Sequence, residues 1–254
     1  MLGLGSNISK RKDAIARIVT DNLVLKHNYN NEPMYQVSTG AADINSDADA
    51  NEYIDVGTIA IGTGSISICA WVYVTAFVDE AAIFSNRHDS SPNQGIELRC
   101  DSNGFEMILD VDVTGSTTVA TPSKSVNQWY HVCGVWDRSS NQYIYVDGVL
   151  DVTPDSLTSR AASLAHTSTA RIGRDAGSTP TDFRGYICNV GYWNRVLSQA
   201  EVKSIMWKNY GGLTSDEKLS MVSWWNLDEE TNTSGAAGTG GVKDHHGSNH
   251  GTLA

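Results

Sequence analysis

Residues 65–75 read SISICAWVYVT, and this stretch decides the fold of the chain. It is rich in β-branched and aromatic residues, which favour strands. Apolar side chains stand at both odd and even positions, whereas a half-exposed strand would alternate between apolar and polar residues. We therefore expect a strand that is buried on both faces and lies in the centre of a sheet.

Short strand-like segments continue along most of the chain. Residues 128–136, QWYHVCGVW, form a second run that is apolar on both faces. The pair Asp147-Gly148 separates two further β-type runs, and such a pair favours a two-residue hairpin because both turn positions need positive φ. Many short strands with almost no helix are typical of a sandwich or a barrel. We expect an all-β fold, an antiparallel β-sandwich.

One helix is marked by its N-terminal signals. Ser198 is a favourable N-cap, and Glu201, three residues later, completes a capping box. Leu197 and Val202 are spaced for a hydrophobic staple. A Gly-Gly pair beyond the apolar positions supplies a stop. We expect a helix over residues 199–210 that covers an open edge or end of the sandwich.

Two segments are expected along the chain. Residues 1–21 form an N-terminal arm that can include a short helix, and residues 22–254 form one sandwich domain whose last strand comes from about residues 221–228. Residues 1–26 hold five Lys and Arg against two Asp, whereas the whole chain has a net charge of −11. The acidic body keeps the protein soluble, and the arm is expected to bind an acidic neighbour. The basic residues of this assembly arm are Lys10, Arg11, Lys12 and Arg17.

Charge and hydropathy exclude several classes of partner. An acidic body argues against nucleic acid, because binding to phosphates needs clustered Lys and Arg. No stretch approaches the roughly 18 apolar residues that span a bilayer, so no membrane segment is expected. The N-terminus lacks the basic and then apolar pattern of a signal peptide, which predicts assembly in a cytoplasm.

The four cysteines, Cys69, Cys100, Cys133 and Cys188, are far apart and include no C-x-x-C pair. Zinc ribbons and thioredoxin-like redox motifs are therefore not expected. Each cysteine stands among strand-like apolar residues, and a buried thiol behaves as a small hydrophobic group. We expect buried free thiols, and an even number leaves disulfides as the alternative.

The order of the strand segments resembles that of a known family. The matching segments are NEYIDVG, SISICAWVYV, IFSNR, NQWYHVCGVWD, YIYVDGVL, ARIGR and FRGYICNVGYWNRVLSQAEV, which together span about residues 50–210. In this order they resemble the concanavalin A-like lectin/glucanase superfamily, in its laminin-G-like branch. The resemblance implies a jelly-roll sandwich.

A second resemblance concerns the function. The short N-terminus, the domain and the tail KDHHGSNHGTLA together resemble structural proteins of marine tailed bacteriophages. This implies a non-catalytic virion surface protein for capsid decoration, fibre or tail attachment, located in the virion. Its expected partners are other virion proteins, further copies of itself and a host-surface glycan. A calcium-dependent carbohydrate-binding module is the alternative function, and a glycoside hydrolase is the third.

The sequence lacks the catalytic motif of the superfamily's glucanases, a set of carboxylates on one strand in an E-x-D-x-x-E arrangement. Glu106, Asp110 and Asp112 fall on one face of a strand, but their spacing differs from that motif. We interpret them as a solvated strand face. The motifs G-x-S-x-G and H-E-x-x-H are absent as well, so the chain is not expected to be an enzyme.

Two sets of residues are candidates for ligand binding. Calcium prefers carboxylate and carbonyl oxygens at Asp- and Asn-rich turns, and similar family members often carry it near such loops. The calcium candidates are Asp43, Asp47, Asp49, Asp244 and Asn249, with an acidic surface loop as the alternative interpretation. A glycan needs aromatic platforms beside polar groups, although most large aromatics are expected in the core. The platform candidates are Tyr192, Trp193, Trp224 and Trp225.

Overall fold

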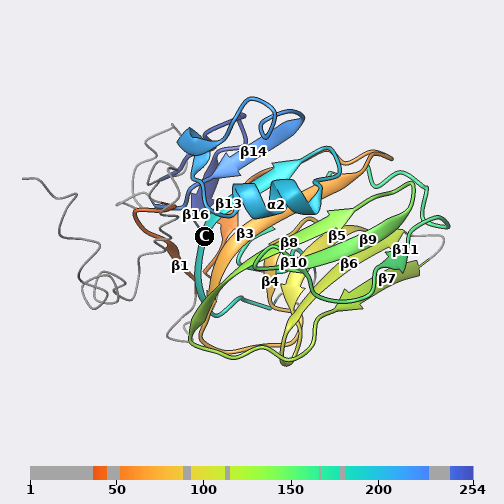
Figure 1. Cartoon of the computed structure of the whole chain (residues 1–254), viewed down its shortest axis with the longest axis horizontal. Helices are drawn as coiled ribbons and strands as arrows, with labels where there is room; N and C mark the ends of the chain where they lie inside the picture. Colours follow the sequence, from red (N-terminus) through yellow and green to blue (C-terminus); the bar gives the residue numbers. More distant parts are fainter. Residues whose placement is uncertain are drawn as a thin grey trace, which may run out of the picture.

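Over the residues that the structure describes, the chain folds as a sandwich of two antiparallel sheets with one short α-helix, as predicted (Figure 1). The computed structural model describes residues 37–44, 52–87, 93–111, 115–165, 167–177, 181–228 and 241–253. The predicted arm and its basic residues lie outside these ranges, as do Asp47, Asp49 and Asp112. Within the ranges, no helix combines the length and the apolar composition needed to cross a membrane.

Sheet A contains the central strand that the sequence predicts. Its strands are, in spatial order, β1 (Ala42–Ile44), β13 (Gly185–Trp193), β3 (Ile66–Val74), β8 (Gln128–Trp136), β9 (Asn141–Val146) and β10 (Val149–Leu150). Two further strands join it beside this path, β11 (Asp155–Ser156) on β9 and β14 (Met221–Trp225) on β13.

Sheet B packs against the inner face of sheet A. Its strands are, in spatial order, β15 (Gly241–Val242), β16 (Gly251–Leu253), β2 (Ile54–Asp55), β12 (Arg171–Ile172), β4 (Ala82–Ser85), β5 (Gln94–Cys100), β6 (Phe105–Val111) and β7 (Gly115–Ala120). The sequence patterns did not predict β7, β15 or β16. Such strands at or near a sheet edge carry little apolar signal, since they bury few side chains.

The inward side chains of β3 form the centre of the core. Ile66, Ile68, Ala70, Val72 and Val74 are all buried and belong to one hydrophobic cluster with side chains of sheet B. Successive side chains of a strand point to opposite faces, so these five share the inner face. β3 pairs with β8 along its whole length and with β13 on the other side.

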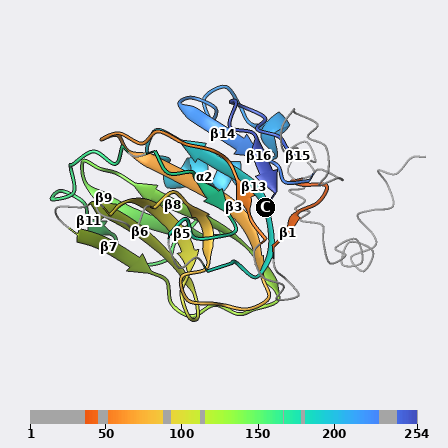
Figure 2. The same cartoon turned by 180° about the vertical axis from the view of Figure 1, so that it is seen from behind.

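The outward side chains of β3 hold the segment that contains the helix. Ser67 Oγ accepts a hydrogen bond from the backbone N–H of Leu197 at 3.0 Å. Cys69 packs under the helix in a second cluster with Val202. Farther along, the indole N–H of Trp71 donates to the carbonyl oxygen of Met206 at 2.7 Å. The helix, α2, therefore lies on the outer side of sheet A, as both Figure 1 and Figure 2 show.

α2 spans Gln199–Ile205 and is shorter than predicted. Its N-terminus is as predicted, because Ser198 and Glu201 form both hydrogen bonds of the capping box. The predicted end at residue 210 is wrong. After Met206 the backbone N–H groups of Trp207 and Lys208 donate three residues back, to the carbonyls of Ser204 and Ile205, so the last turn tightens and the α-helix ends. The carbonyl oxygen of Met206 accepts the indole hydrogen bond from β3.

The predicted hairpin between β9 and β10 is confirmed. Asp147 and Gly148 have φ values of 50° and 75°, as a two-residue turn of this kind requires. A Cβ at position 148 would lie 2.7 Å from Cγ of Lys203 on α2. Glycine is therefore required for the turn and for the close approach of the helix.

All four cysteines are buried and free, as predicted. Cys69 on β3 lies directly opposite Cys133 on β8. Burial raises the pKa of the Cys69 thiol, and the neighbouring Cys133 raises it further. Burial also raises the pKa of the Cys188 thiol to about 12. Because the thiolate is the reactive form, these thiols are expected to be inert in the folded protein.

A thiol count in the folded and unfolded states tests this arrangement. In a colorimetric titration with an aromatic disulfide reagent, we expect no reaction in the native protein and reaction of all four thiols in denaturant without reductant. Cys133→Ser is the control and should leave three. Two reactive thiols in the unfolded wild type, rising to three in Cys133→Ser, would instead show a disulfide between Cys69 and Cys133.

Candidate functional site

The predicted aromatic platform lies inside the protein. Tyr192, Trp193, Trp224 and Trp225 are each at most 1% exposed. The indole N–H of Trp193 donates to the carbonyl of Glu217 at 2.7 Å, and that of Trp225 donates to the carbonyl of Asn249 at 2.7 Å. The four side chains fill the interior, as large aromatics do in sandwich cores. In this structure they present no ring face to a ligand.

Of the predicted calcium residues that the structure describes, Asp244 and Asn249 lie together in the C-terminal turn, joined by a hydrogen bond from the Asn249 backbone N–H to Asp244 Oδ2 at 3.0 Å. Asp43 is exposed on β1, whereas Asp244 is 3% exposed. The carboxylate of Asp244 accepts backbone hydrogen bonds of 2.9–3.0 Å from Trp224, His246, Gly247 and Asn249. It therefore organises the C-terminal turn. No group of three or more His, Cys, Asp or Glu side chains suited to a metal occurs among the described residues.

Three half-buried aromatic side chains cross the part of sheet A that the helix segment leaves open. Tyr73 on β3 lies directly opposite Tyr186 on β13 and Trp129 on β8. The ring of Tyr73 is 5.7 Å from each neighbouring ring, centroid to centroid. Interplanar angles of 54° and 62° give the surface a corrugated shape. We call Tyr186, Tyr73 and Trp129 the aromatic row.

The orientation of Trp129 leaves carbon atoms facing outward. Its Nε1 is buried and has no hydrogen-bond partner among the described residues. Its ring also packs against a small cluster that contains Trp71, Cys188 and Met206. Since the polar edge of the indole points inward, the half-exposed part of Trp129 is apolar ring surface.

Polar groups border the aromatic row. Asp43 lies directly opposite Tyr186 and extends the row by one exposed carboxylate. Thr75 and Arg184 continue the pairing beyond the row, with the backbone N–H of Thr75 donating to the carbonyl of Arg184 at 3.0 Å. Asn127, just before β8, is exposed. Hydroxyl, guanidinium, amide and carboxylate groups therefore lie around three ring surfaces.

The sequence contained part of the signal for this row. Tyr73 lies two residues after Trp71, and side chains two residues apart in a strand point to the same face. The prediction that both faces are buried is correct for most of β3 but not for Tyr73, which is half-buried. The sequence alone does not indicate where the segment that contains α2 stops covering the outer face of β3.

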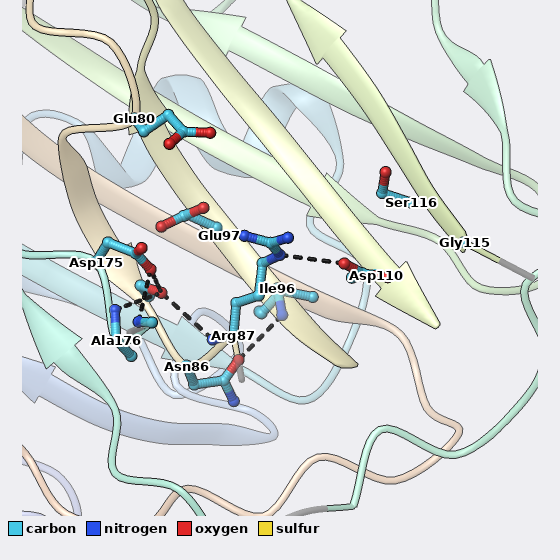
Figure 3. Close-up of polar contacts among 12 residues, drawn as sticks. Glu80, Asn86, Arg87, Ile96, Glu97, Asp110, Gly115, Ser116, Asp175 and Ala176 are labelled. Carbon is cyan, nitrogen blue, oxygen red and sulfur yellow. Dashed lines mark hydrogen bonds and ion pairs between the residues drawn. The ribbon is translucent and has the colours of Figure 1, made fainter. Parts of the chain in front are cut away.

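The outer face of sheet B is polar and carries a network of ion pairs. Arg99 contacts Glu106 at 2.6 Å, Glu80 at 3.2 Å and Glu97 at 3.4 Å. Four residues farther along β6 than Glu106, Asp110 Oδ2 lies 3.2 Å from Arg87 Nε (Figure 3). The charges of this face are thus engaged mainly with one another.

Two predicted face residues were misinterpreted as solvated. Asp110 is 4% exposed and paired with Arg87, and the side chain of Glu106 is largely covered by its contact with Arg99. The partner arginines come from β5 and from just after β4. The alternation of side chains in β6 alone could therefore not indicate that Asp110 and Glu106 are covered.

Glu97 is the most deeply buried charge-bearing group of this network. Its side chain is fully buried beside Arg99, at 3.4 Å from that guanidinium. Burial raises the pKa of Glu97 well above its ordinary value, and the charge of Asp175 raises it further, against the opposing effect of Arg99. Asp175 also accepts hydrogen bonds from Ser85 Oγ at 3.3 Å and from the backbone N–H of Gly177 at 3.0 Å. Burial and the neighbouring charge therefore favour the protonated, neutral form of Glu97.

Several known proteins are similar to this chain. Pentraxin-related protein PTX3 of Mus musculus is 24% identical over 174 residues, which cover 65% of this chain and 43% of that protein. Among solved structures, a protein of Bacteroides ovatus proposed to bind carbohydrate has a TM-score of 0.61 at 20% identity, covering 84% of this chain and 57% of that one. A heptameric SAP-like pentraxin of Limulus polyphemus has a TM-score of 0.49 at 17% identity, covering 61% and 76%.

Two of these three relatives are longer proteins, and the chain matches only part of each. The chain spans 43% of the mouse protein and 57% of the Bacteroides chain. The likeness to the Bacteroides structure shows a shared fold. The model of one family matches residues 47–203, which is more than half of the chain. The chain therefore belongs to the concanavalin A-like lectin/glucanases superfamily.

Proposed function

We propose that this chain is a non-catalytic carbohydrate-binding domain whose glycan lies on the aromatic row. The observation that carries the proposal is the placement of Tyr186, Tyr73 and Trp129 in one register row, half-exposed, beyond the segment held by Trp71. The description of the Bacteroides relative agrees with this function.

The chemistry of the row suits a sugar. A pyranose has apolar C–H faces and a rim of hydroxyl groups, so it needs ring surface beneath and polar groups around it. The aromatic row supplies the ring surface, with the outward part of Trp129 free of polar atoms. Asp43, Thr75 and Asn127 border the row and offer acceptors and donors for the hydroxyl rim.

The carboxyl groups on sheet B support a non-catalytic role. Retaining glycosidases hold two carboxyl groups about 5–5.5 Å apart, and inverting ones about 6.5–9.5 Å apart, on either side of the scissile bond. Glu97 and Asp175 are 0% and 8% exposed, so these two carboxyl groups are not open to a glycosidic bond. Glu106 and Asp110 are each held by an arginine.

A role on a virion surface stays a prediction, and so do virion partners, a virion location and self-association. Their basis is the resemblance of the short N-terminus, the domain and the tail, taken together, to structural proteins of marine tailed bacteriophages. Adhesion of such a particle to a host glycan would use the same aromatic row. Calcium dependence also stays a prediction, because Asp43 is the only member of its predicted loop set among the described residues.

Affinity electrophoresis tests the proposed function. In native gels that contain barley β-glucan, laminarin, xylan or galactomannan, we expect at least one polysaccharide to retard the wild type. Trp129→Ala removes one stacking surface and should weaken binding by about tenfold. Tyr53→Ala is the matched control, because Tyr53 is a half-buried ring on the other sheet, 4.8 Å from the guanidinium of Arg171.

Two results would contradict the proposal. If none of the polysaccharides retards the wild-type protein, with or without added calcium, the proposed carbohydrate binding is contradicted. Retardation that survives Trp129→Ala but is lost in Tyr53→Ala would move the site to sheet B. Thermal melting of each variant confirms that it is folded.

The buried carboxyl of Glu97 predicts a pH dependence of stability. Its folded pKa is raised, so below the unfolded value of about 4.5 both states are protonated and stability is fully present. As the pH rises, the unfolded state ionises first, and the free energy of unfolding falls until the folded pKa is passed. Glu97→Gln cannot ionise and keeps the shape of the side chain.

Melting temperatures between about pH 4 and about pH 8 measure this effect. We expect the melting temperature of Glu97→Gln, relative to wild type, to increase with pH across this range. Glu80→Gln is the control, since it removes an exposed carboxylate that contacts the same Arg99. If the difference in melting temperature between Glu97→Gln and wild type stays constant or decreases as the pH rises, the pKa of Glu97 is not raised in the folded protein, and this prediction is wrong.

A further inference from the structure

We infer that the aromatic row binds an internal stretch of a linear, neutral glycan that runs across the strands, with one sugar over each ring. This inference rests on the proposed function and specifies its ligand class. It has three supports, which are the straightness of the row, its open end and the distribution of charge around it.

The row is straight because strand pairing makes it so. Tyr186, Tyr73 and Trp129 are direct partners across three adjacent antiparallel strands. Hydrogen bonding holds neighbouring strands about 4.8 Å apart, so side chains in one register line up perpendicular to the strands. The two centroid distances are equal at 5.7 Å. Equal steps along a line suit a polymer with a repeating unit of similar length.

The row is open beside Trp129. The next strand, β9, pairs with β8 from Val132 to Trp136 only. The turn that follows β9 closes beside His131, whose backbone N–H donates to Asp147 Oδ1 at 2.9 Å. At the level of Trp129, β8 is therefore the edge of sheet A within the described residues. An enclosed pocket surrounds its ligand on most sides, whereas this open row lets a chain extend beyond it.

The charge around the row favours a neutral chain. Recognition of sulfate or carboxylate groups relies on arginine clusters that form charge-assisted hydrogen bonds. The three rings are uncharged, and Asp43 at one end would repel an anionic sugar. Of the four residues that border the row, Asp43, Thr75, Asn127 and Arg184, only Arg184 is basic.

A ladder of oligosaccharides tests the inference by titration calorimetry. The probes are the gluco-oligosaccharides with β-1,3 and β-1,4 linkages, the xylo-oligosaccharides and the manno-oligosaccharides, each from one to six units. For the series that matches the retarding polysaccharide, affinity should rise by about fivefold to tenfold with each unit up to three units. It should change little beyond that length.

Variants of the end and of the middle of the row should differ. Tyr186→Ala removes an end ring, so it should abolish the gain from two units to three and leave the affinity for two units within about twofold. Tyr73→Ala removes the middle ring and should weaken both ligands. Tyr143→Ala is the control, because Tyr143 is a half-buried ring of sheet A that stacks on Tyr145 instead, with centroids 6.5 Å apart.

The outcomes separate the inference from the proposed function. A wild-type protein that binds one unit as tightly as three, or Tyr186→Ala and Tyr73→Ala with the same loss for two units, overturns the linear arrangement but keeps carbohydrate binding. Tighter binding of heparin than of every neutral polysaccharide overturns the neutral class. Absence of binding to all oligosaccharides and polysaccharides contradicts the proposed function itself.

Discussion

The burial of β3 from both sides is the constraint on which the rest of the structure depends. Its inner side chains, from Ile66 to Val74, fill the space between the sheets, and its outer side chains hold the helix segment. A shift of one residue in its pairing would exchange the two sets. The same alternation places Tyr73 on the outer face, so the core and the aromatic row are fixed together.

The helix segment then determines how much of the outer face remains accessible. Ser67 and Trp71 both hydrogen-bond to it, and the bond from Trp71 to Met206 comes just after the last helical residue. Tyr73 lies one step beyond these contacts and is half-buried. On the opposite side of the sandwich, Glu97 and its neighbours form a network that is satisfied mainly from within. The two outer faces thus have different chemistry, one apolar and half-open, one ionic and mostly closed.

Local sequence was sufficient for the features that depend on adjacent residues. The hairpin at Asp147 and the capping box at Ser198 follow from turn and cap chemistry, and the two-sided strand at residues 65–75 follows from its composition. Exposure of large aromatics depends on contacts between distant segments. Trp193 is covered partly by the segment that contains Glu217, and the aromatic row exists only once β3, β8 and β13 are paired. The pattern therefore predicted the fold and the scarcity of exposed tryptophan, but the rings that it named as a platform are buried.

The central claim is that glycan contacts the aromatic row and not the aromatics of the interior. The chain has seven Trp residues, and their indole N–H signals can be assigned by single Trp→Phe variants in nitrogen-15 NMR spectra. During titration with laminarihexaose and cellohexaose, the account predicts the largest shift for the Trp129 signal and little change for Trp193 and Trp225. Shifts confined to Trp193, Trp224 or Trp225, with Trp129 unchanged, would contradict it.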